Sequence, residues 1–273
     1  MIYVDAPGAR IPALGLGTWQ LDRQVARRMV GCALEIGYRH IDTAQMYGNE
    51  TEVGAAIASS GVAGDDIWLT TKIWPDNFRD GALQRAADAS VRRLRTEPDL
   101  LLLHWPNPSV PLAETMRALN DAKRRGLARN IGVSNFTVAL IQEALARSEE
   151  PLIVDQVEYH PYLSQDAVRE ELHANGMALI AYSPLAKGRV FGDPTLARIG
   201  ERYGKTAGQV TLRWLIQQDG VAAIPRSSRE THAKANFDIF DFALSDHEMA
   251  TIAALARPNG RQIDPLGMAP RWD

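Results

Sequence analysis

The chain has 273 residues, 45% of them hydrophobic, with a formal net charge of −3 and an isoelectric point near 6.1. This length can supply a large core, and without a basic excess or an acidic run we expect no nucleic-acid partner and no disordered tail. A single cysteine, Cys32, excludes an intrachain disulfide. No apolar run approaches the roughly 18 residues of a membrane-spanning helix, and the amino terminus lacks the features of a secretory signal. We therefore expect a cytoplasmic protein with no membrane partner.

Short β-prone pieces flank Gly8 within residues 2–12 and predict an N-terminal hairpin. Eight apolar runs rich in Leu, Ile or Val follow. Most of them are almost continuously apolar, as strands buried on both faces are. We place these strands at 13–17, 38–42, 67–72, 99–105, 130–134, 153–159, 178–184 and 221–225.

Helical patterns separate the predicted strands. Two of them carry apolar stripes at 3.6-residue spacing, formed by Val25, Met29, Val30, Ala33 and Leu34 and by Leu83, Ala87, Val91 and Leu94. A third begins near Met116 and closes with the basic residues 123–125 and Gly126, a pattern typical of the last turn of a helix. The interval from Tyr182 to Pro225 is longer than the others and has room for an extra helix.

Strict alternation of strands and helices implies a parallel sheet, and eight such units favour a closed barrel over an open sheet. No linker or low-complexity stretch divides the chain. We therefore predict an α/β protein whose single domain, 1–273, is a (β/α)8 TIM barrel. The N-terminal β-hairpin would lie at the bottom of the barrel, and extra helices would follow near the C-terminus.

Each predicted strand ends in a polar residue or a glycine, and in a TIM barrel the carboxyl ends of the strands build the active site. In chain order these residues are Gly17 with Thr18, Asp42, Lys72, His104, Ser134 with Asn135, Gln156, Tyr182, and Arg226 with Ser227. Packing gives no reason to combine Lys, Asp and His at buried strand ends, because buried charges need partners. The combination predicts one converging polar site.

Several of these segments resemble the signature motifs of the aldo-keto reductase family. They are 41–50 (IDTAQMYGNE), 71–74 (TKIW), 103–106 (LHWP), 131–136 (IGVSNF), 155–162 (DQVEYHPY) and 181–185 (AYSPL). The resemblance runs in uninterrupted order from about residue 10 to residue 245. The tail 264–273 also resembles the bacterial 2,5-diketo-D-gluconate reductase B group.

The resemblance implies an NADPH-dependent monomer that reduces small ketoaldehydes, aldehydes or keto-sugar acids to alcohols. Such a reaction needs a hydride from the nicotinamide and a proton from a positioned acid. We predict Tyr47 as the acid, with Lys72 lowering the pKa of its phenol and Asp42 holding Lys72 by a salt bridge. His104 would donate a second hydrogen bond to the carbonyl oxygen and orient it.

The resemblance also implies where the cofactor and substrate bind. The nicotinamide would be held through its carboxamide by Ser134, Asn135 and Gln156, and its ring would stack against Tyr182. The remaining contacts around that end of NADP⁺ would come from Gly17, Thr18, Asp42, Ser183 and Leu185. Three tryptophans that follow strands one, three and four would form an apolar substrate wall beside Tyr47 and His104, namely Trp19, Trp74 and Trp105.

The segment after the last strand predicts a site for the 2′-phosphate of NADPH. A helix N-terminus attracts anions, and arginines add charge-assisted donors. The predicted contacts are Arg226, Ser227, Ser228, Arg229, His232 and Asn236. Either serine is suited to cap the helix that follows. His232 and Ala235 stand where the family commonly carries an arginine and a glutamate, which predicts a weaker preference for NADPH than the family norm.

Three alternatives compete with this interpretation. Residues 14–20 contain two glycines of a dinucleotide fingerprint, but Gln20 takes the place of the third, which argues against a Rossmann site. His40, Asp42 and His104 could form a metal site of a barrel hydrolase, yet Lys72 beside them would repel a cation, so we expect no metal. A non-catalytic binding protein would be marked by loss of one of the four catalytic residues, and none is lost. The HExxH and GxSxG motifs are absent.

Overall fold

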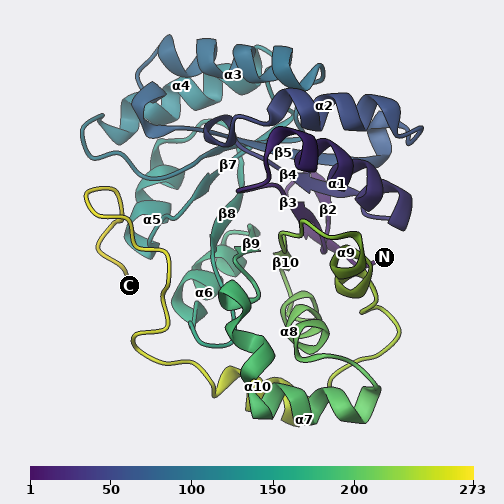
Figure 1. Ribbon diagram of the computed structural model, residues 1–273. Coiled ribbons are helices and arrows are strands. Elements are labelled where there is room, and N and C mark those ends of the chain that lie inside the picture. The colour runs from purple at the N-terminus through teal and green to yellow at the C-terminus, as the bar shows by residue number, and fades with distance from the viewer.

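The computed structural model describes residues 1–273, and its centre is a parallel barrel (Figure 1). Eight strands are hydrogen-bonded in sequential order, and every neighbouring pair is parallel. They are β3 (Leu16–Gly17), β4 (His40–Asp42), β5 (Trp68–Ile73), β6 (Leu100–Leu103), β7 (Asn130–Ser134), β8 (Leu152–Glu158), β9 (Ala178–Tyr182) and β10 (Val221–Ala223). All eight overlap the predicted strands, so the predicted fold is confirmed.

Contacts just outside the named strands join the first strand to the last. Leu14 bridges Ala223, and Gly17 bridges Arg226, both in parallel register. A Cβ atom at Gly17 would lie 2.9 Å from the carbonyl oxygen of Ile224, closer than side-chain carbons normally approach. Glycine at this position therefore allows the two ends of the sheet to meet.

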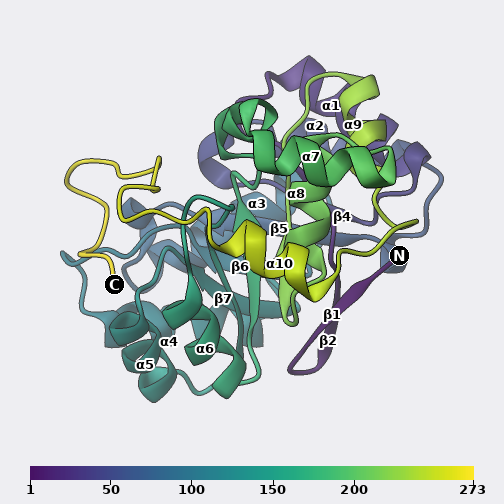
Figure 2. The same ribbon diagram turned by 90° about the horizontal axis from the view of Figure 1, so that it is seen from below.

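The predicted hairpin is present as β1 (Tyr3–Ala6) and β2 (Ala9–Pro12), which pair antiparallel across a turn that contains Gly8 at a φ of +74°. β1 packs against β9 and β10, and Pro7 lies beside Gly176, just before β9 begins. The hairpin therefore covers the amino-terminal end of the barrel, as Figure 2 shows from below.

Helices cover the outside of the barrel (Figures 1 and 2). Those that follow the first six barrel strands are α1 (Arg23–Ile36), α2 (Glu50–Ser59), α3 (Ala82–Leu94), α4 (Leu112–Arg124), α5 (Val138–Arg147) and α6 (Asp166–Ala174). The predicted stripes of α1 and α3 face inward, because all their members are buried except Val25 and Val91, which are half-buried. α4 ends at Arg124, before Gly126 with a φ of +70°, as predicted.

The long interval between β9 and β10 contains more than one connecting helix. It holds the 3-10 segment η4 (Ala186–Gly192), then α7 (Pro194–Tyr203) and α8 (Ala207–Ile216). α9 (Glu230–Phe237) and α10 (Asp246–Ala253) follow β10. The extra helices that the sequence predicts are therefore confirmed.

The barrel interior and the layer beneath the helices form one hydrophobic cluster. β6 illustrates the pattern, because it consists of four consecutive leucines that are all fully buried. Strands covered on both faces need no alternation of polar and apolar residues. No helix has the length and hydropathy to cross a membrane.

Candidate active site

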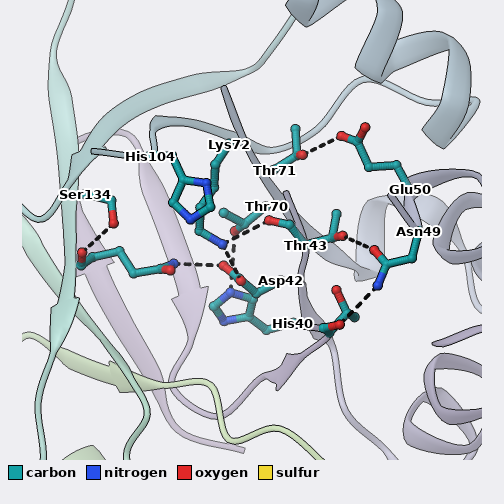
Figure 3. Close-up of polar contacts among 12 residues, drawn as sticks. His40, Asp42, Thr43, Asn49, Glu50, Thr70, Thr71, Lys72, His104 and Ser134 are labelled. Carbon is teal, nitrogen blue, oxygen red and sulfur yellow. Dashed lines mark hydrogen bonds and ion pairs between the residues drawn. The ribbon is translucent and has the colours of Figure 1, made fainter. Parts of the chain in front are cut away.

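Four strands bring polar side chains together inside the carboxyl end of the barrel (Figure 3). Lys72 donates from Nζ to Asp42 Oδ1 at 2.5 Å and to the carbonyl oxygen of Thr43 at 2.9 Å, and the two charged side chains are only 1% and 2% exposed. Gln156 Nε2 donates to the second oxygen of Asp42 at 2.8 Å, and the Ser134 hydroxyl donates to the Gln156 carbonyl at 2.7 Å. The predicted convergence of strand ends is therefore observed.

Tyr47 lies at the edge of this cluster, in the 3-10 turn η1 (Gln45–Tyr47) that follows β4. Its ring centroid is 5.2 Å from Lys72 Nζ and 5.7 Å from the His104 ring, which meets it edge-on. The Trp19 ring lies 6.4 Å away on another side. The four residues predicted to be catalytic therefore form one group around Tyr47.

Asn49 fixes the segment that carries Tyr47. Its amide nitrogen donates to the carbonyl oxygens of Thr18 at 3.0 Å and Leu21 at 3.2 Å, and its amide oxygen accepts from the Thr43 hydroxyl at 2.8 Å. Asn49 therefore ties the turn after β4 to the loop after β3 (Figure 3).

Glu50, the next residue, anchors the start of α2. Its carboxylate accepts from the Thr71 hydroxyl at 2.6 Å and from Arg93 Nε at 2.7 Å, and it is 1% exposed. No role was predicted from the sequence for Asn49 or Glu50. The only signal was that both close the 41–50 motif, which also contains Asp42 and Tyr47.

His104 lies one residue beyond β6, and its N–H continues the ladder by donating to the Ile73 carbonyl at 3.0 Å. Its ring is buried and packs edge-on against Trp74 at 5.3 Å. Burial holds the pKa of His104 well below its ordinary value, and the positive charge of Lys72 lowers it further. The ring is therefore neutral, carries one N–H donor, and can hydrogen-bond a substrate oxygen.

The pKa of Tyr47 departs from our expectation. Burial raises it well above its ordinary value, and Asp42 and Tyr182 raise it further. The sequence predicted that Lys72 would lower it, and the structure contradicts that direction. The reason is that burial of the phenol outweighs the charge of Lys72, which is itself desolvated and paired with Asp42. Tyr47 is therefore protonated at neutral pH and available as a proton donor.

The predicted nicotinamide contacts lie beside this group. Asn135, with a φ of +64°, donates to the His104 carbonyl at 3.0 Å and to Ser134 Oγ at 3.1 Å. It also accepts from the Tyr182 hydroxyl at 2.6 Å. Ser183 follows with a φ of +48° and turns the chain towards Leu185 and η4. These residues place a connected set of amide and hydroxyl groups at the carboxyl ends of β7, β8 and β9.

The segment predicted to bind the 2′-phosphate begins in the loop after β10 and continues into α9. Two of its predicted contacts, Ser227 and Asn236, are buried. The other four are exposed, namely Arg226, Ser228, Arg229 and His232. The predicted serine cap is wrong, because α9 begins after Arg229 and receives no side-chain cap. Ser227 instead turns inward, accepting from the Arg229 N–H at 3.2 Å and donating to the Arg229 carbonyl at 2.7 Å.

The three tryptophans occupy different positions. Trp19 is 39% exposed and lies near Tyr47, and Trp74 is half-buried against His104. Trp105 is buried, and its ring packs edge-on against Trp272 of the C-terminal tail at 6.2 Å. The tail therefore places a fourth tryptophan, Trp272, beside Trp105, and no role was predicted for it from the sequence.

The alternative metal site finds little support in this geometry. His40 Nδ1 lies 3.1 Å from the Pro12 carbonyl, and Lys72 occupies the Asp42 oxygen that a cation would need. The protein has no group of three or more His, Cys, Asp or Glu side chains that could hold a metal ion.

Asp155, next to Gln156 in β8, is a buried carboxyl group outside the catalytic cluster. It is completely buried, and neither of its oxygens has a well-formed hydrogen bond. Burial raises the pKa of Asp155 well above its ordinary value, opposed by the Phe136 N–H and reinforced by Asp273. At a pH between the pKa values of the unfolded and folded states, the folded protein therefore keeps a proton that the unfolded chain has released.

This linkage predicts a pH-dependent effect of Asp155→Asn. Because the folded pKa is raised, the wild type loses stability as pH rises above about 3.9, by up to about 1.4 kcal/mol per pH unit until the folded pKa is reached. The variant does not lose stability in this way. Its free energy of unfolding in urea, relative to that of the wild type, should therefore be about 1 kcal/mol or more higher at pH 8 than at pH 4. A difference that stays constant between pH 4 and pH 8 would contradict the raised pKa.

Comparison with known proteins agrees with this geometry. Residues 13–257 match the sequence profile of the Aldo/keto reductase family. A Salmonella typhi protein named methylglyoxal reductase DkgB is 41% identical over 267 residues, covering 96% of this chain and 99% of that protein. A Mycolicibacterium smegmatis aldo-keto reductase is 42% identical over 261 residues, covering 94% of each chain.

Solved structures show the same architecture. The crystal structure of a candidate 2,5-diketo-D-gluconic acid reductase B has a TM-score of 0.98 and 50% identity, covering 100% of this chain and 98% of that one. This agrees with the narrower resemblance of the tail. The NADPH complex of a Gox0644 mutant has a TM-score of 0.90 at 33% identity, covering 96% of each chain. The sequence, the barrel and the cluster around Asp42 all agree that this chain belongs to the aldo/keto reductase family.

Proposed function

We propose that this protein uses NADPH to reduce aldehydes and ketones to alcohols, and that Tyr47 donates the proton. The observation that carries the proposal is the buried Lys72–Asp42 pair at 2.5 Å beneath Tyr47, with the neutral His104 ring on the other side. Small ketoaldehydes, other aldehydes and keto-sugar acids are the expected substrates. We expect the protein to act as a monomer.

The residues present suit a nicotinamide cofactor. Thr18 Oγ1 is buried beside the cluster and has no hydrogen-bond partner, so it has capacity left for a ligand. Ser134, Asn135 and Gln156 offer both donors and acceptors, which a carboxamide requires. The planar ring of Tyr182 is held by its bond to Asn135 and is suited to stack against a nicotinamide. A bound reduced nicotinamide would supply the hydride.

The protein's own residues would then handle the proton. His104 would orient the carbonyl oxygen by donating one hydrogen bond, and Tyr47 would donate its phenolic proton as negative charge develops there. Lys72 would stabilise the phenolate as it forms, because its charge is held 5.2 Å from the ring. Asp42 would keep Lys72 charged and in place, since burial alone would lower the pKa of that amine.

The proposal is tested by turnover of an aldehyde and diketone panel that includes methylglyoxal and D-glucuronate. NADPH oxidation should be followed by the loss of its near-ultraviolet absorbance and ranked by kcat/KM, with NADH and EDTA arms. We expect turnover with NADPH and no effect of EDTA. Absence of turnover across the panel, or loss of turnover with EDTA, would overturn the proposal.

The cofactor preference is tested by Arg226→Ala. We propose that Arg226 and Arg229, both exposed beside the uncapped start of α9, bind the 2′-phosphate. The substitution should raise the KM for NADPH by about 10-fold or more, the scale of a lost bond to a charged group, and leave NADH kinetics nearly unchanged. Lys234→Ala, which removes an exposed charge within α9, is the control. Equal losses with both cofactors, or a wild-type preference for NADH, would contradict this assignment.

A further inference from the structure

Glu50, the first residue of α2, is a buried carboxylate beside the strand that carries Lys72 (Figure 3). Its side chain is only 1% exposed, and both of its oxygens accept hydrogen bonds. Burying a carboxylate is costly unless its charge is paired and its oxygens are bonded. An acidic residue in the first turn of a helix is also favourable when it is exposed to solvent, so helix formation alone does not explain why Glu50 is buried.

The segment that carries Tyr47 has few contacts of its own. None of residues 45–48 is fully buried, and the Tyr47 N–H donates within the turn, to the Ala44 carbonyl at 3.0 Å. Gly48 follows with a φ of +67°, in the left-handed region, and leads the chain out of η1. The position of the phenol therefore depends on the residues that hold this segment from either side.

Gln45 and Glu50, on either side of Tyr47, connect this segment to β5 and to the residue after it. Gln45 Oε1 accepts from the Trp74 N–H at 3.3 Å. Glu50 Oε1 accepts from the Thr71 hydroxyl at 2.6 Å. The second bond is the shorter one, and its acceptor is a carboxylate, which makes such bonds stronger than neutral ones.

The bond from Thr71 to Glu50 links the two residues that handle the proton. Thr71 and Lys72 are consecutive in β5, so their side chains point to opposite faces of the strand. Lys72 points into the barrel, to Asp42, while Thr71 points outward and meets Glu50, three positions after Tyr47. The charge of Glu50 also acts on Lys72, because burial lowers the pKa of Lys72 and Glu50 adds to the opposing effect of Asp42.

Arg93 of α3 holds the second oxygen of Glu50. Its Nε donates to Glu50 Oε2 at 2.7 Å. The two helices approach closely at Gly54, one turn after Glu50 on the same face of α2, where an added Cβ would lie 2.2 Å from the Leu94 carbonyl oxygen. Arg93 therefore balances the charge of Glu50 and leaves Oε1 to the Thr71 hydroxyl.

We propose that Glu50 is a positioning residue for proton transfer, and that its bond from Thr71 sets the distance between the Tyr47 phenol and the Lys72 ammonium. The inference rests on the proposed function and adds a residue that acts through Tyr47 without touching the substrate. A misplacement of about 1 Å can lower the rate of an enzyme by about 100-fold. Loss of the Glu50–Thr71 bond should therefore slow the chemical step without weakening cofactor binding.

The first test changes Thr71. Thr71→Val removes the hydroxyl and keeps the size and branching of the side chain. It should lower the single-turnover rate constant for an aldehyde with saturating NADPH by about 10-fold or more, and change the Kd for NADPH by less than about twofold. Thr71→Ser, which restores the hydroxyl, should recover most of the rate. Urea unfolding of both variants would show that each is folded under the assay conditions.

The second test changes the carboxylate and has a matched control. In Glu50→Gln, a side chain turned to keep its bond from Arg93 presents its NH₂ group to Thr71, so the bond from Thr71 is lost. The control is Glu248→Gln, because Glu248 of α10 is also a buried carboxylate that accepts from a hydroxyl, that of Tyr203 at 2.7 Å, and from an arginine of α7. Both substitutions should lower stability in urea. Only Glu50→Gln should lower the single-turnover rate constant, by at least about fivefold.

Each other kinetic outcome has a defined meaning. A rate constant for Thr71→Val equal to that of wild type would overturn the inference, as would a loss that Thr71→Ser fails to restore. Equal losses in Glu50→Gln and Glu248→Gln would make the effect one of stability alone and overturn it too. If wild type reduced no aldehyde at all, the proposed function would fail instead.

Hydrogen exchange tests the positioning role without turnover. Peptides that span residues 44–49 would be followed by mass spectrometry in the protein with NADP⁺ added. Their amides should exchange at least about 10-fold faster in Thr71→Val than in wild type, because the segment opens locally more often. Thr71→Ser and Glu248→Gln should exchange at the wild-type rate. Unchanged exchange in Thr71→Val would overturn the inference whatever the protein reduces.

Discussion

Tyr47→Phe should lower kcat for carbonyl reduction by about 100-fold or more, the scale of lost general acid catalysis. The substitution keeps the ring against Trp19 and His104 and removes only the hydroxyl. Because that phenol is protonated at neutral pH in this structure, its loss removes the proton donor itself. Single-turnover kinetics with an aldehyde, together with a fluorescence titration of NADPH, would separate chemistry from cofactor binding, and NADPH affinity should barely change.

A matched control for this prediction is Tyr159→Phe. The Tyr159 hydroxyl donates to Gln218 at 2.7 Å and takes no part in the cluster around Asp42, so its removal costs a hydrogen bond without touching the reaction. Its turnover should stay close to wild type. If Tyr47→Phe retained near-normal turnover while folded, the proton would have to come from another donor and the proposed mechanism would fail.

Lys72→Met should abolish most turnover and also destabilise the fold by about 3–5 kcal/mol. The loss of stability follows because Asp42 would stay buried without its charge partner. The loss of turnover follows because no cation would remain beside Tyr47 to stabilise the phenolate as the proton leaves. Urea unfolding would measure the first effect, and kcat for an aldehyde with NADPH the second.

The double variant Lys72→Met with Asp42→Leu separates these two effects. Removing both charges replaces an unpaired buried charge by apolar groups of similar size, which is often neutral for stability. We expect the double variant to recover most of the stability and none of the activity. If the double variant recovered both stability and activity, the Lys72–Asp42 pair would be structural only. Full activity of Lys72→Met from mildly acidic to mildly alkaline pH would lead to the same conclusion.

The strands and the catalytic residues could be predicted because local patterns determine them. β6 is a run of leucines, and Asp42, Lys72 and Gln156 lie at or near the ends of apolar runs, where a parallel barrel must bring them together. Their grouping therefore follows from the number of strands and their direction. A resemblance to known motifs added the role of Tyr47, which lies in a loop.

Features set by contacts between distant residues could not be predicted in this way. The direction of the Tyr47 pKa shift depends on how deeply the packed structure buries the phenol, which the sequence does not reveal. The cap of α9 depends on which way Ser227 turns. The tail has no periodic pattern, and its path over the site is fixed by bonds from Gln262 to Glu158, far earlier in the chain.

The closure of the barrel has a consequence for biosynthesis. The pairing of Leu14 with Ala223 joins residues from nearly opposite ends of the chain. The ribosome synthesises the N-terminal part first. The edge of the sheet at β3 therefore stays unpaired until β10 has been made and has left the exit tunnel. Contacts of such long sequence separation slow folding and leave intermediates prone to aggregation. Chaperone demand during translation should therefore persist until almost the whole polypeptide has emerged.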